Sequence, residues 1–452
     1  MNKPNILLVV IDTLRWDYFQ KFLSENYAFS DRLKDFVNFE AAFTPSPWTL
    51  PSHFSLFTGL YPSEHGVHEN QISELEDIFL KARRYSGDFL TDVAEQQGYQ
   101  TIGISANPMI SSLTGFDRKF DSFYSIDPIN LTGYENILQA GKKDIVQEKY
   151  ASNGFPDKIR KGRSYIKSIM RGYPKNKGYK IALSLIDRIH LSKPFFCFIN
   201  FMEMHDPYSV NFHRDDNHAS LEDLFALRHL TKNKIENLQR SYYEQIHYVK
   251  VTILNLIDFL KRNGLYDETL IILTSDHGQA LRERNYYGHG IFLYDELVHI
   301  PLLVKPPSNF LQNADKRAYV SLVNLFGLIR ESMLGNDEAL ELLRNDHVFC
   351  ESFGMQHSKS LLKKYIHLQE KNNTYEEANL RRKSIIKNGW KLSVNCGSAP
   401  NIEEFFCYNK SEQEERTKLE DLLLELEIFN VDKNFMIPSI VGKSFQNIEN
   451  LR

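Results

Sequence analysis

The chain has 452 residues, of which 42% are hydrophobic and 25% charged, as in a folded protein with a large core. Its 54 Lys and Arg residues are balanced by 58 Asp and Glu residues, which argues against a dedicated nucleic-acid-binding protein. Four separated cysteines, Cys197, Cys350, Cys396 and Cys407, argue against a disulfide scaffold or a zinc ribbon.

A strand buried on both faces of a sheet is predicted at residues 5–11, where Asn5 is followed by six consecutive aliphatic residues. Asp12 follows this run, at the end of the strand where open α/β sheets carry their chemistry. The run is too short to cross a bilayer, and no small-residue cleavage site follows it. We therefore expect no membrane span and a cytoplasmic location.

Further apolar strands are predicted at 101–105, 195–201 and 270–274, and helices at 86–97 and 237–263. Alternation of strands and helices at this spacing indicates a mostly parallel sheet in an α/β fold. We assign residues 1–345 to a catalytic domain with this architecture.

Two regions differ from this pattern. Residues 158–180 contain nine Lys or Arg residues, within an insertion at about 125–190 that is either a solvated surface or a basic rim attracting an anionic substrate. From residue 346, short strands are predicted at 384–387, 390–394 and 405–408, followed by a charged helix at 411–426. Residues 346–452 are therefore expected to form a smaller α+β subdomain that completes the pocket.

Four polar motifs follow apolar strands or lie at sharp turns, at residues 12–15, 46–66, 200–208 and 275–290. Each has an ordinary structural explanation, because an Asp after a strand often caps a helix and a Thr near Pro often belongs to a turn. Together, however, carboxylate, imidazole and hydroxyl groups at several strand ends of one sheet can converge on a divalent cation.

In this order the four motifs resemble those of the sulfatase-like branch of the alkaline phosphatase superfamily. The resemblance runs from Asn5 to about Pro301 and rests on Asn-Ile-Leu-Leu-Val-Val-Ile-Asp-Thr-Leu-Arg at 5–15 and Pro-Ser-His-Phe-Ser-Leu-Phe-Thr-Gly-Leu-Tyr-Pro at 51–62. It resumes weakly at 382–392. It implies an alkaline-phosphatase-like fold, a mixed and mostly parallel sheet flanked by helices with a smaller C-terminal α+β subdomain.

The resemblance also implies roles for individual residues. The metal-binding positions are matched by Asp12, Asp276 and His277, together with Thr49, which stands at the position of the nucleophile. His205 and His289 match positions that line the pocket around the transferred group, where imidazoles can act as acid, base or hydrogen-bond donor. The remaining candidates for substrate contact are Asn107, His53, Arg15 and Tyr208.

The departures from the family pattern bear on the chemistry. Sulfatases oxidise a Cys or Ser at the position of Thr49 to formylglycine, and the methyl group on the β-carbon of Thr49 prevents formation of that aldehyde. Threonine is the nucleophile in superfamily members that transfer phosphoryl groups. Thr13 replaces the second Asp of the sulfatase pair and His277 replaces an Asn, which favours zinc or manganese over calcium or magnesium. His53 stands where an Arg supports formylglycine, so the local positive charge is weaker.

The number of metal ions stays open, with one or two as the alternatives. Relatives with two zinc ions carry an Asp followed four residues later by a His. Asp206 lies in the matching motif, but Val210 occupies the second position. Glu203, His205 and His289 could still form part of a second site.

Four functions follow from these residues. The leading hypothesis is a metal-dependent hydrolase that cleaves phosphate mono- or diesters through Thr49. The alternatives are a phospho(ethanolamine)transferase, a sulfatase that acts without formylglycine, and a non-catalytic protein that keeps the fold. The expected substrate is a small-molecule or glycan phosphate or sulfate ester, not a nucleic acid. If the hypothesis holds, the side chains of Asp12, Thr49, Asp276 and His277 lie within about 4–5 Å of one another.

Overall fold

The computed structural model describes residues 3–68, 75–126, 177–206, 208, 231–284, 286–311, 314–354, 379–396, 400–408 and 415–429. Residues 127–176, which hold most of the predicted basic insertion, lie outside the described residues.

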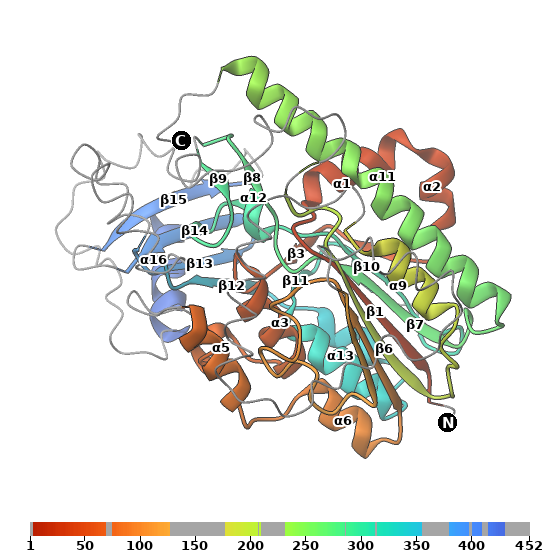
Figure 1. The fold of residues 1–452 in the computed structure, drawn as a ribbon. Coiled ribbons are helices and arrows are strands. Elements are labelled where there is room, and N and C mark those ends of the chain that lie inside the picture. Colours follow the sequence, from red (N-terminus) through yellow and green to blue (C-terminus); the bar gives the residue numbers. More distant parts are fainter. Residues whose placement is uncertain are drawn as a thin grey trace.

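A seven-stranded sheet forms the centre of the molecule, with the order β2-β10-β7-β1-β6-β4-β5 (Figure 1). The five strands from β7 to β5 are parallel, and β10 runs antiparallel to both β7 and β2. This confirms the mixed, mostly parallel sheet of an α/β fold. The strands are β1 (Asn5–Ile11), β2 (Val37–Phe39), β4 (Gln100–Ser105), β5 (Ser122–Ser125), β6 (Phe195–Phe201), β7 (Thr269–Thr274) and β10 (Leu302–Lys305).

Helices cover both faces of this sheet. Successive side chains of a strand point to opposite faces, so the apolar strands present side chains that must be buried on both. Leu7 and Val9 of β1 belong to one core cluster, and Ile6 and Leu8 belong to the other. The first cluster packs against α1 (Trp16–Glu25), α2 (Tyr27–Arg32), α9 (Tyr179–Ile186) and α11 (Lys232–Arg262). The second packs against α3 (Thr49–Thr58), α5 (Leu75–Arg84), α6 (Leu90–Gln96) and α13 (Val323–Met333).

Two predicted helices have different bounds in the structure. The helix expected at 86–97 begins only at Leu90, because the Asp92 carboxylate accepts the backbone N–H of Phe89 at 3.0 Å and caps the first turn. The helix expected from residue 237 begins at Lys232. Its first residues are exposed and polar, so they carry no apolar periodicity that could reveal them.

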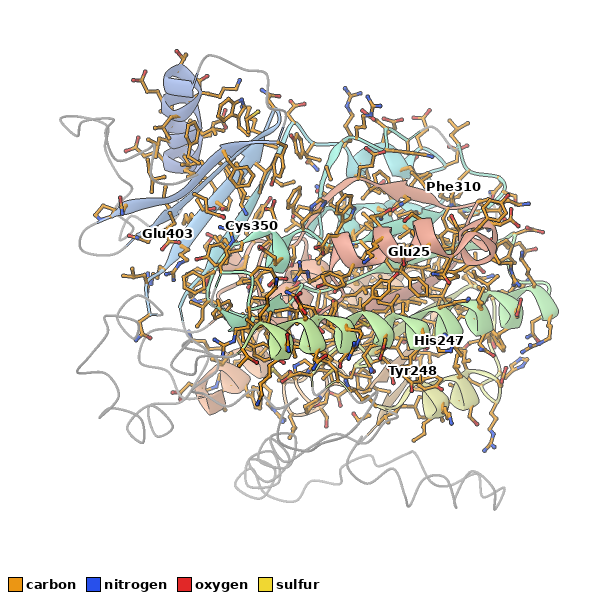
Figure 2. All side chains as sticks on the ribbon, turned by 90° about the horizontal axis from the view of Figure 1, so that it is seen from above. Glu25, His247, Tyr248, Phe310, Cys350 and Glu403 are labelled. Carbon is orange, nitrogen blue, oxygen red and sulfur yellow. The ribbon has the colours of Figure 1, made fainter. Side chains whose placement is uncertain are left out.

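The C-terminal region contains a four-stranded antiparallel sheet in the order β12-β13-β14-β15, with α16 (Glu415–Phe429) packed on it. Figure 2 shows Cys350 of β12 and Glu403 of β15 in this sheet, at the other side of the molecule from His247 of α11. A further apolar cluster, including Phe43 and Val348, joins it to the region around the central sheet. The strands are β12 (His347–Ser352), β13 (Arg382–Lys387), β14 (Trp390–Asn395) and β15 (Asn401–Cys407).

Short elements connect the two sheets. They are β3 (Ala41–Phe43) paired with β11 (Tyr319–Ser321), β8 (Ala280–Leu281) paired with β9 (Tyr287–Gly288), helices α4 (Pro62–His65) and α12 (Asp295–Val298), and a 3₁₀ helix (Ala339–Leu343). In the part of the chain that the structure describes, each helix is too short or too polar to cross a membrane. The cellular location stays a prediction.

Candidate metal centre and nucleophile

Polar side chains from four strands meet at one edge of the central sheet. Asp12 directly follows β1, and Asp276 lies two residues beyond β7. Asn107 lies two residues beyond β4, and His205 follows β6 by four residues. These four strands are parallel neighbours, so their carboxyl ends share this edge.

Thr49 reaches the same place from the first turn of α3. Its side chain is almost wholly buried, and its Oγ1 lies 3.4 Å from Asp12 Oδ2 and 3.2 Å from His277 Nε2. The start of a helix carries partial positive charge, which favours an anion at this hydroxyl. The helix ends at Gly59, whose φ of 71° is the left-handed conformation of a C-terminal cap.

The buried carboxylates of Asp12 and Asp276 each have one oxygen that accepts hydrogen bonds and one that accepts none. Asp12 Oδ2 accepts the amide N–H of Asn107 at 2.6 Å, and Asp276 Oδ1 accepts the backbone N–H groups of Thr13 and His277 at 3.2 and 2.8 Å. Asp12 Oδ1 and Asp276 Oδ2 are buried without a hydrogen bond. Burial and the charge of Asp276 raise the pKa of Asp12 to about 6. Two buried acceptors of like charge call for a cation.

His277 completes the set. Its Nδ1–H donates to the Gly278 carbonyl at 2.8 Å, which in the neutral ring leaves a lone pair on Nε2. That atom lies 3.5 Å from Asp276 Oδ2 and 4.0 Å from Asp12 Oδ1. The three ligand atoms lie within 4.8 Å of one another. Two ligands of a tetrahedral zinc ion lie about 3.3–3.6 Å apart at bond lengths of about 2.0–2.2 Å, so small side-chain movements would let these residues hold a divalent metal.

The described residues do not form a second group of potential metal ligands like this one. Across the described ranges, no other group of three His, Cys, Asp or Glu side chains brings its ligand atoms this close together. Glu203 instead accepts the backbone N–H of Tyr179 at 3.0 Å, and Asp206 pairs with His205. The described residues therefore assemble one candidate metal site.

His205 and His289 lie beside this site, with ring centroids 5.4 Å apart. His205 Nδ1 donates to the Asp206 carbonyl at 2.8 Å and lies 3.0 Å from its Oδ1. Burial acts to lower the pKa of His205, but Asp206 more than compensates and raises it to about 9. His289 Nδ1 donates to Gln279 Oε1 at 2.7 Å, and its ring lies 4.4 Å from that of His277.

Lys177 supports His205 and was not identified from the sequence. It is buried, and its ammonium donates to the backbone carbonyls of Glu203 and His205. Burial lowers the pKa of Lys177 to about 8. Because Lys177 belongs to the basic stretch at 158–180, the sequence favours a solvated position. Only the fold brings it beneath the loop after β6.

The ring nitrogens of His53 are both engaged inside the protein. Nδ1–H donates to the Thr49 carbonyl at 2.9 Å, and Nε2 accepts the side-chain N–H of Asn200 at 3.2 Å. Burial lowers the pKa of His53, so the ring is neutral at pH 7. His53 thus lies behind Thr49 and supports the first turn of α3.

Arg15 and Tyr208 also lie behind the site. The Arg15 guanidinium bonds Asp17 at 2.7 Å and the carbonyl of Gln279 at 3.1 Å, and it pairs with Glu283. Tyr208 is fully buried in the core. Of the four residues expected to contact substrate, Asn107 bonds Asp12 Oδ2 at 2.6 Å, and His53 Nδ1 lies 3.6 Å from Asp276 Oδ2.

Gly278 permits a close approach between the backbone of its loop and that of α12, which was not identified from the sequence. A β-carbon at this position would lie 2.1 Å from the carbonyl oxygen of Glu296. Its N–H donates to Leu297 O at 2.8 Å, and its own carbonyl orients His277. Because glycine has no β-carbon, α12 can pack directly beneath His277.

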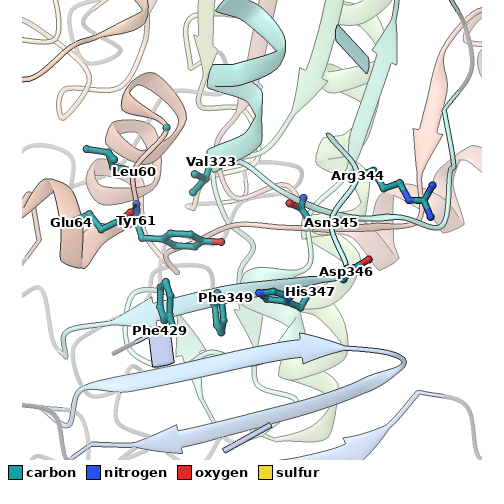
Figure 3. A pocket seen from close by; sticks show the side chains of 11 residues that line it. Leu60, Tyr61, Glu64, Val323, Arg344, Asn345, Asp346, His347, Phe349 and Phe429 are labelled. Atoms are coloured by element: carbon teal, nitrogen blue, oxygen red, sulfur yellow. Dashed lines mark hydrogen bonds between the residues drawn. The ribbon is translucent and has the colours of Figure 1, made fainter. Parts of the chain in front are cut away.

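A cavity of about 820 Å³ lies between the region around the central sheet and the C-terminal sheet (Figure 3). Tyr61, Phe349 and Phe429 form one wall, and Arg344 and His347 line another part. Because Gly59–Tyr61 follow the C-terminal end of α3, the cavity lies at the opposite end of that helix from Thr49. It does not contain the metal-ligating side chains.

The chain is similar in amino-acid sequence to known proteins. The Sulfatase family model matches residues 4–333. An arylsulfatase of Clostridium perfringens is 20% identical over 357 residues, which cover 72% of this chain and 73% of that protein. A choline-sulfatase of Rhizobium meliloti is 22% identical over 340 residues, which cover 68% of this chain and 63% of that protein.

Solved structures share the fold. A phosphonate monoester hydrolase of Agrobacterium radiobacter superposes with a TM-score of 0.62 at 17% identity, covering 95% of this chain and 96% of that one. A putative sulfatase, yidJ, from Bacteroides fragilis gives 0.61 at 14% identity, covering 95% of each chain. Proteins with this fold thus include ones named for sulfate esters and ones named for phosphonate esters.

Proposed function

This chain belongs to the sulfatase family, and from that premise we propose that it is a metal-dependent hydrolase of phosphate mono- or diesters with Thr49 as its nucleophile. The observation that carries the proposal is the position of the Thr49 hydroxyl, 3.4 Å from Asp12 Oδ2 and 3.2 Å from His277 Nε2 at a helix N-terminus. A threonine there cannot form the formylglycine aldehyde, and the position of its hydroxyl beside Asp12 and His277 supports the role of nucleophile.

Asp12, Asp276, His277 and Thr49 would hold the metal. Two carboxylates and an imidazole favour zinc or manganese over calcium or magnesium. The bound ion supplies positive charge that lowers the pKa of the Thr49 hydroxyl and balances charge on the transferred group. The two buried oxygens without hydrogen bonds, Asp12 Oδ1 and Asp276 Oδ2, support this assignment.

The reaction follows from the placement of the side chains. Thr49 Oγ, whose hydroxyl proton is lost to solvent as its pKa falls, attacks phosphorus in line with the leaving alcohol, so that a phosphothreonine forms as the P–O bond to the alcohol breaks. We assign protonation of the leaving oxygen to His205, whose pKa of about 9 keeps it protonated at pH 7. Water then attacks phosphorus and gives a proton to the neutral His205, the bond between Thr49 Oγ and phosphorus breaks with the electron pair left on Oγ, and phosphate or a phosphate monoester is released.

Asn107 and the start of α3 complete the proposed pocket. The Asn107 amide donates to Asp12 at 2.6 Å and lies at the edge of the site. The partial positive charge at the start of α3 favours an anionic group near Thr49. A small-molecule or glycan ester is the proposed substrate class.

A hydrolysis panel tests the proposal. Protein reconstituted with Zn²⁺ or Mn²⁺ would be assayed with nitrophenyl phosphate, bis-nitrophenyl phosphate, a phenylphosphonate ester and nitrophenyl sulfate. We expect phosphoester turnover that falls at least about 10³-fold in Thr49→Ala. Thr58→Ala is the matched control, because Thr58 lies on the same helix and its hydroxyl bonds backbone groups, donating to the carbonyl of Phe54 at 2.6 Å and accepting the N–H of Leu60 at 3.3 Å.

Other outcomes identify the alternatives. Sulfate ester turnover without phosphoester turnover would refute the proposal in favour of a sulfatase that needs no formylglycine. Phosphoryl transfer to an added alcohol in place of water would indicate a transferase. Mass spectrometry of acid-quenched wild type provides a direct check, since a phosphoryl group on Thr49 is expected.

A further inference from the structure

A buried tyrosine on α11 holds the loop that follows β1, although it belongs to none of the sequence motifs. The Tyr242 side chain is fully buried. Its hydroxyl donates to the carbonyl of Thr13 at 2.7 Å and accepts the backbone N–H of Arg15 at 2.9 Å. Both hydrogen-bonding roles of one phenol thus act on the same short loop.

The backbone of that loop is unusual. Thr13 has a φ of 61°, in the left-handed region that a β-branched residue rarely adopts. Such a conformation persists only where surrounding contacts impose it. Tyr242 bonds the carbonyl of this residue, and the hydroxyl of Ser275 accepts the N–H of the next residue, Leu14, at 2.9 Å.

The left-handed turn directs one specific hydrogen bond. It points the N–H of Thr13 at Asp276 Oδ1, 3.2 Å away. The same oxygen accepts the N–H of His277. With Oδ1 held twice, the carboxylate presents its other oxygen, Oδ2, 3.5 Å from His277 Nε2. The orientation of a metal-ligating carboxylate therefore depends on the turn at Thr13.

We propose that Tyr242 is a positioning residue for the metal centre, which holds the left-handed turn at Thr13 and thereby selects the oxygen of Asp276 that faces the ion. Its hydroxyl bonds backbone atoms and no metal-ligating side chain. The inference rests on the part of the proposed function that assigns a divalent metal to Asp12, Asp276 and His277.

The test compares two neighbouring tyrosines. Tyr242→Phe keeps the ring and its edge contact with Tyr18 but removes the hydroxyl. Tyr243→Phe is the matched control, because its hydroxyl bonds Glu25 at the surface. Full-length protein freed of metal would be titrated with Co²⁺. We expect the Co²⁺ dissociation constant to rise about 10–100-fold in Tyr242→Phe, with a changed visible spectrum, and to stay unchanged in Tyr243→Phe.

A rescue variant separates positioning from general loss of stability. Glycine adopts a left-handed φ without strain, so Tyr242→Phe combined with Thr13→Gly should recover most of the Co²⁺ affinity. Failure of the rescue in a folded protein, or Co²⁺ binding by Tyr242→Phe that equals wild type, would overturn the proposal.

The premise is tested in the same experiment. Wild type that binds no Co²⁺ would overturn both the metal assignment and the role of Tyr242. If wild type binds Co²⁺, the rescue succeeds and yet no phosphoester is cleaved, the positioning role stands and the proposed function fails.

Discussion

Two clusters of buried carboxylates in the described part of the chain are satisfied in different ways. At the end of the central sheet, the ion-pairing groups that the described residues bring within 4.0 Å of Asp12 and Asp276 are the imidazoles of His53 and His277. In the C-terminal sheet, the buried Lys391 ammonium lies 2.6 Å from Asp295 Oδ1 and 3.1 Å from Glu404 Oε2. It also donates to the carbonyl of Leu293 at 2.7 Å.

The pKa values reflect this difference. Burial raises the pKa of Asp12, and the charge of Asp276 raises it further, to about 6. Burial also acts to raise the pKa of Asp295, but Lys391 outweighs it and the pKa is lowered. A buried charge cluster that contains its own cation is therefore structural, whereas one that lacks a cation indicates a ligand site.

The largest effect is expected when the metal-ligating cluster is altered. Asp276→Asn keeps an Oδ1 atom that can accept the two backbone N–H groups but removes the charge that would bind the metal. We expect kcat/KM to fall about 10⁴-fold or more. In a chelator, its melting temperature should match or exceed that of wild type, because a repulsive carboxylate pair is relieved. A marked drop in the metal-free melting temperature would break the comparison.

Altering the Lys391–Asp295–Glu404 cluster should lower stability and leave activity nearly unchanged. Lys391→Met leaves Asp295 and Glu404 without their shared cation, so the free energy of unfolding should fall by about 3–5 kcal/mol in urea titrations. The kcat of the folded protein should change little. Lys387→Met is the control, since Lys387 pairs with Glu425 at the surface and should contribute about 1 kcal/mol or less. Equal losses from the two variants would contradict the assignment.

The smallest effect concerns acid pH. The pKa of Asp295 is lower in the folded chain than in the unfolded one, so its ionised form contributes stability above about pH 4 that is lost as pH falls further. Asp295→Asn should remove that contribution and make unfolding free energy less dependent on pH on the acid side. Chemical denaturation at a series of pH values measures this slope. A slope identical to that of wild type would show that Lys391 does not hold this carboxylate.

The sequence predicted the parts that follow from strand ends. An unbroken aliphatic run located β1, and the rule that chemistry collects at the carboxyl ends of parallel strands brought Asp12, Asp276 and His277 together. Thr49 could be placed beside them by its motif. Their roles in the reaction stay predictions.

Other features depend on contacts between distant segments, which local patterns do not reveal. Nothing near Thr13 predicts its left-handed backbone, because the phenol that holds it lies 229 residues away. Tyr208, expected near the substrate, packs edge-on against Tyr242 with ring centroids 5.3 Å apart. Lys177 is buried only because the loop after β6 covers it.

The central position of β1 also sets the order in which the protein can become active during synthesis. β1 is synthesised before its two neighbours in the sheet, β6 and β7, and 263 positions separate Thr13 from its partner Asp276. Until β7 has been made, the first strand has no neighbour on that side and the metal ligands are incomplete. If the candidate site binds a metal as proposed, binding can follow only after the sheet is complete, and a nascent chain that ends before β7 is expected to bind none.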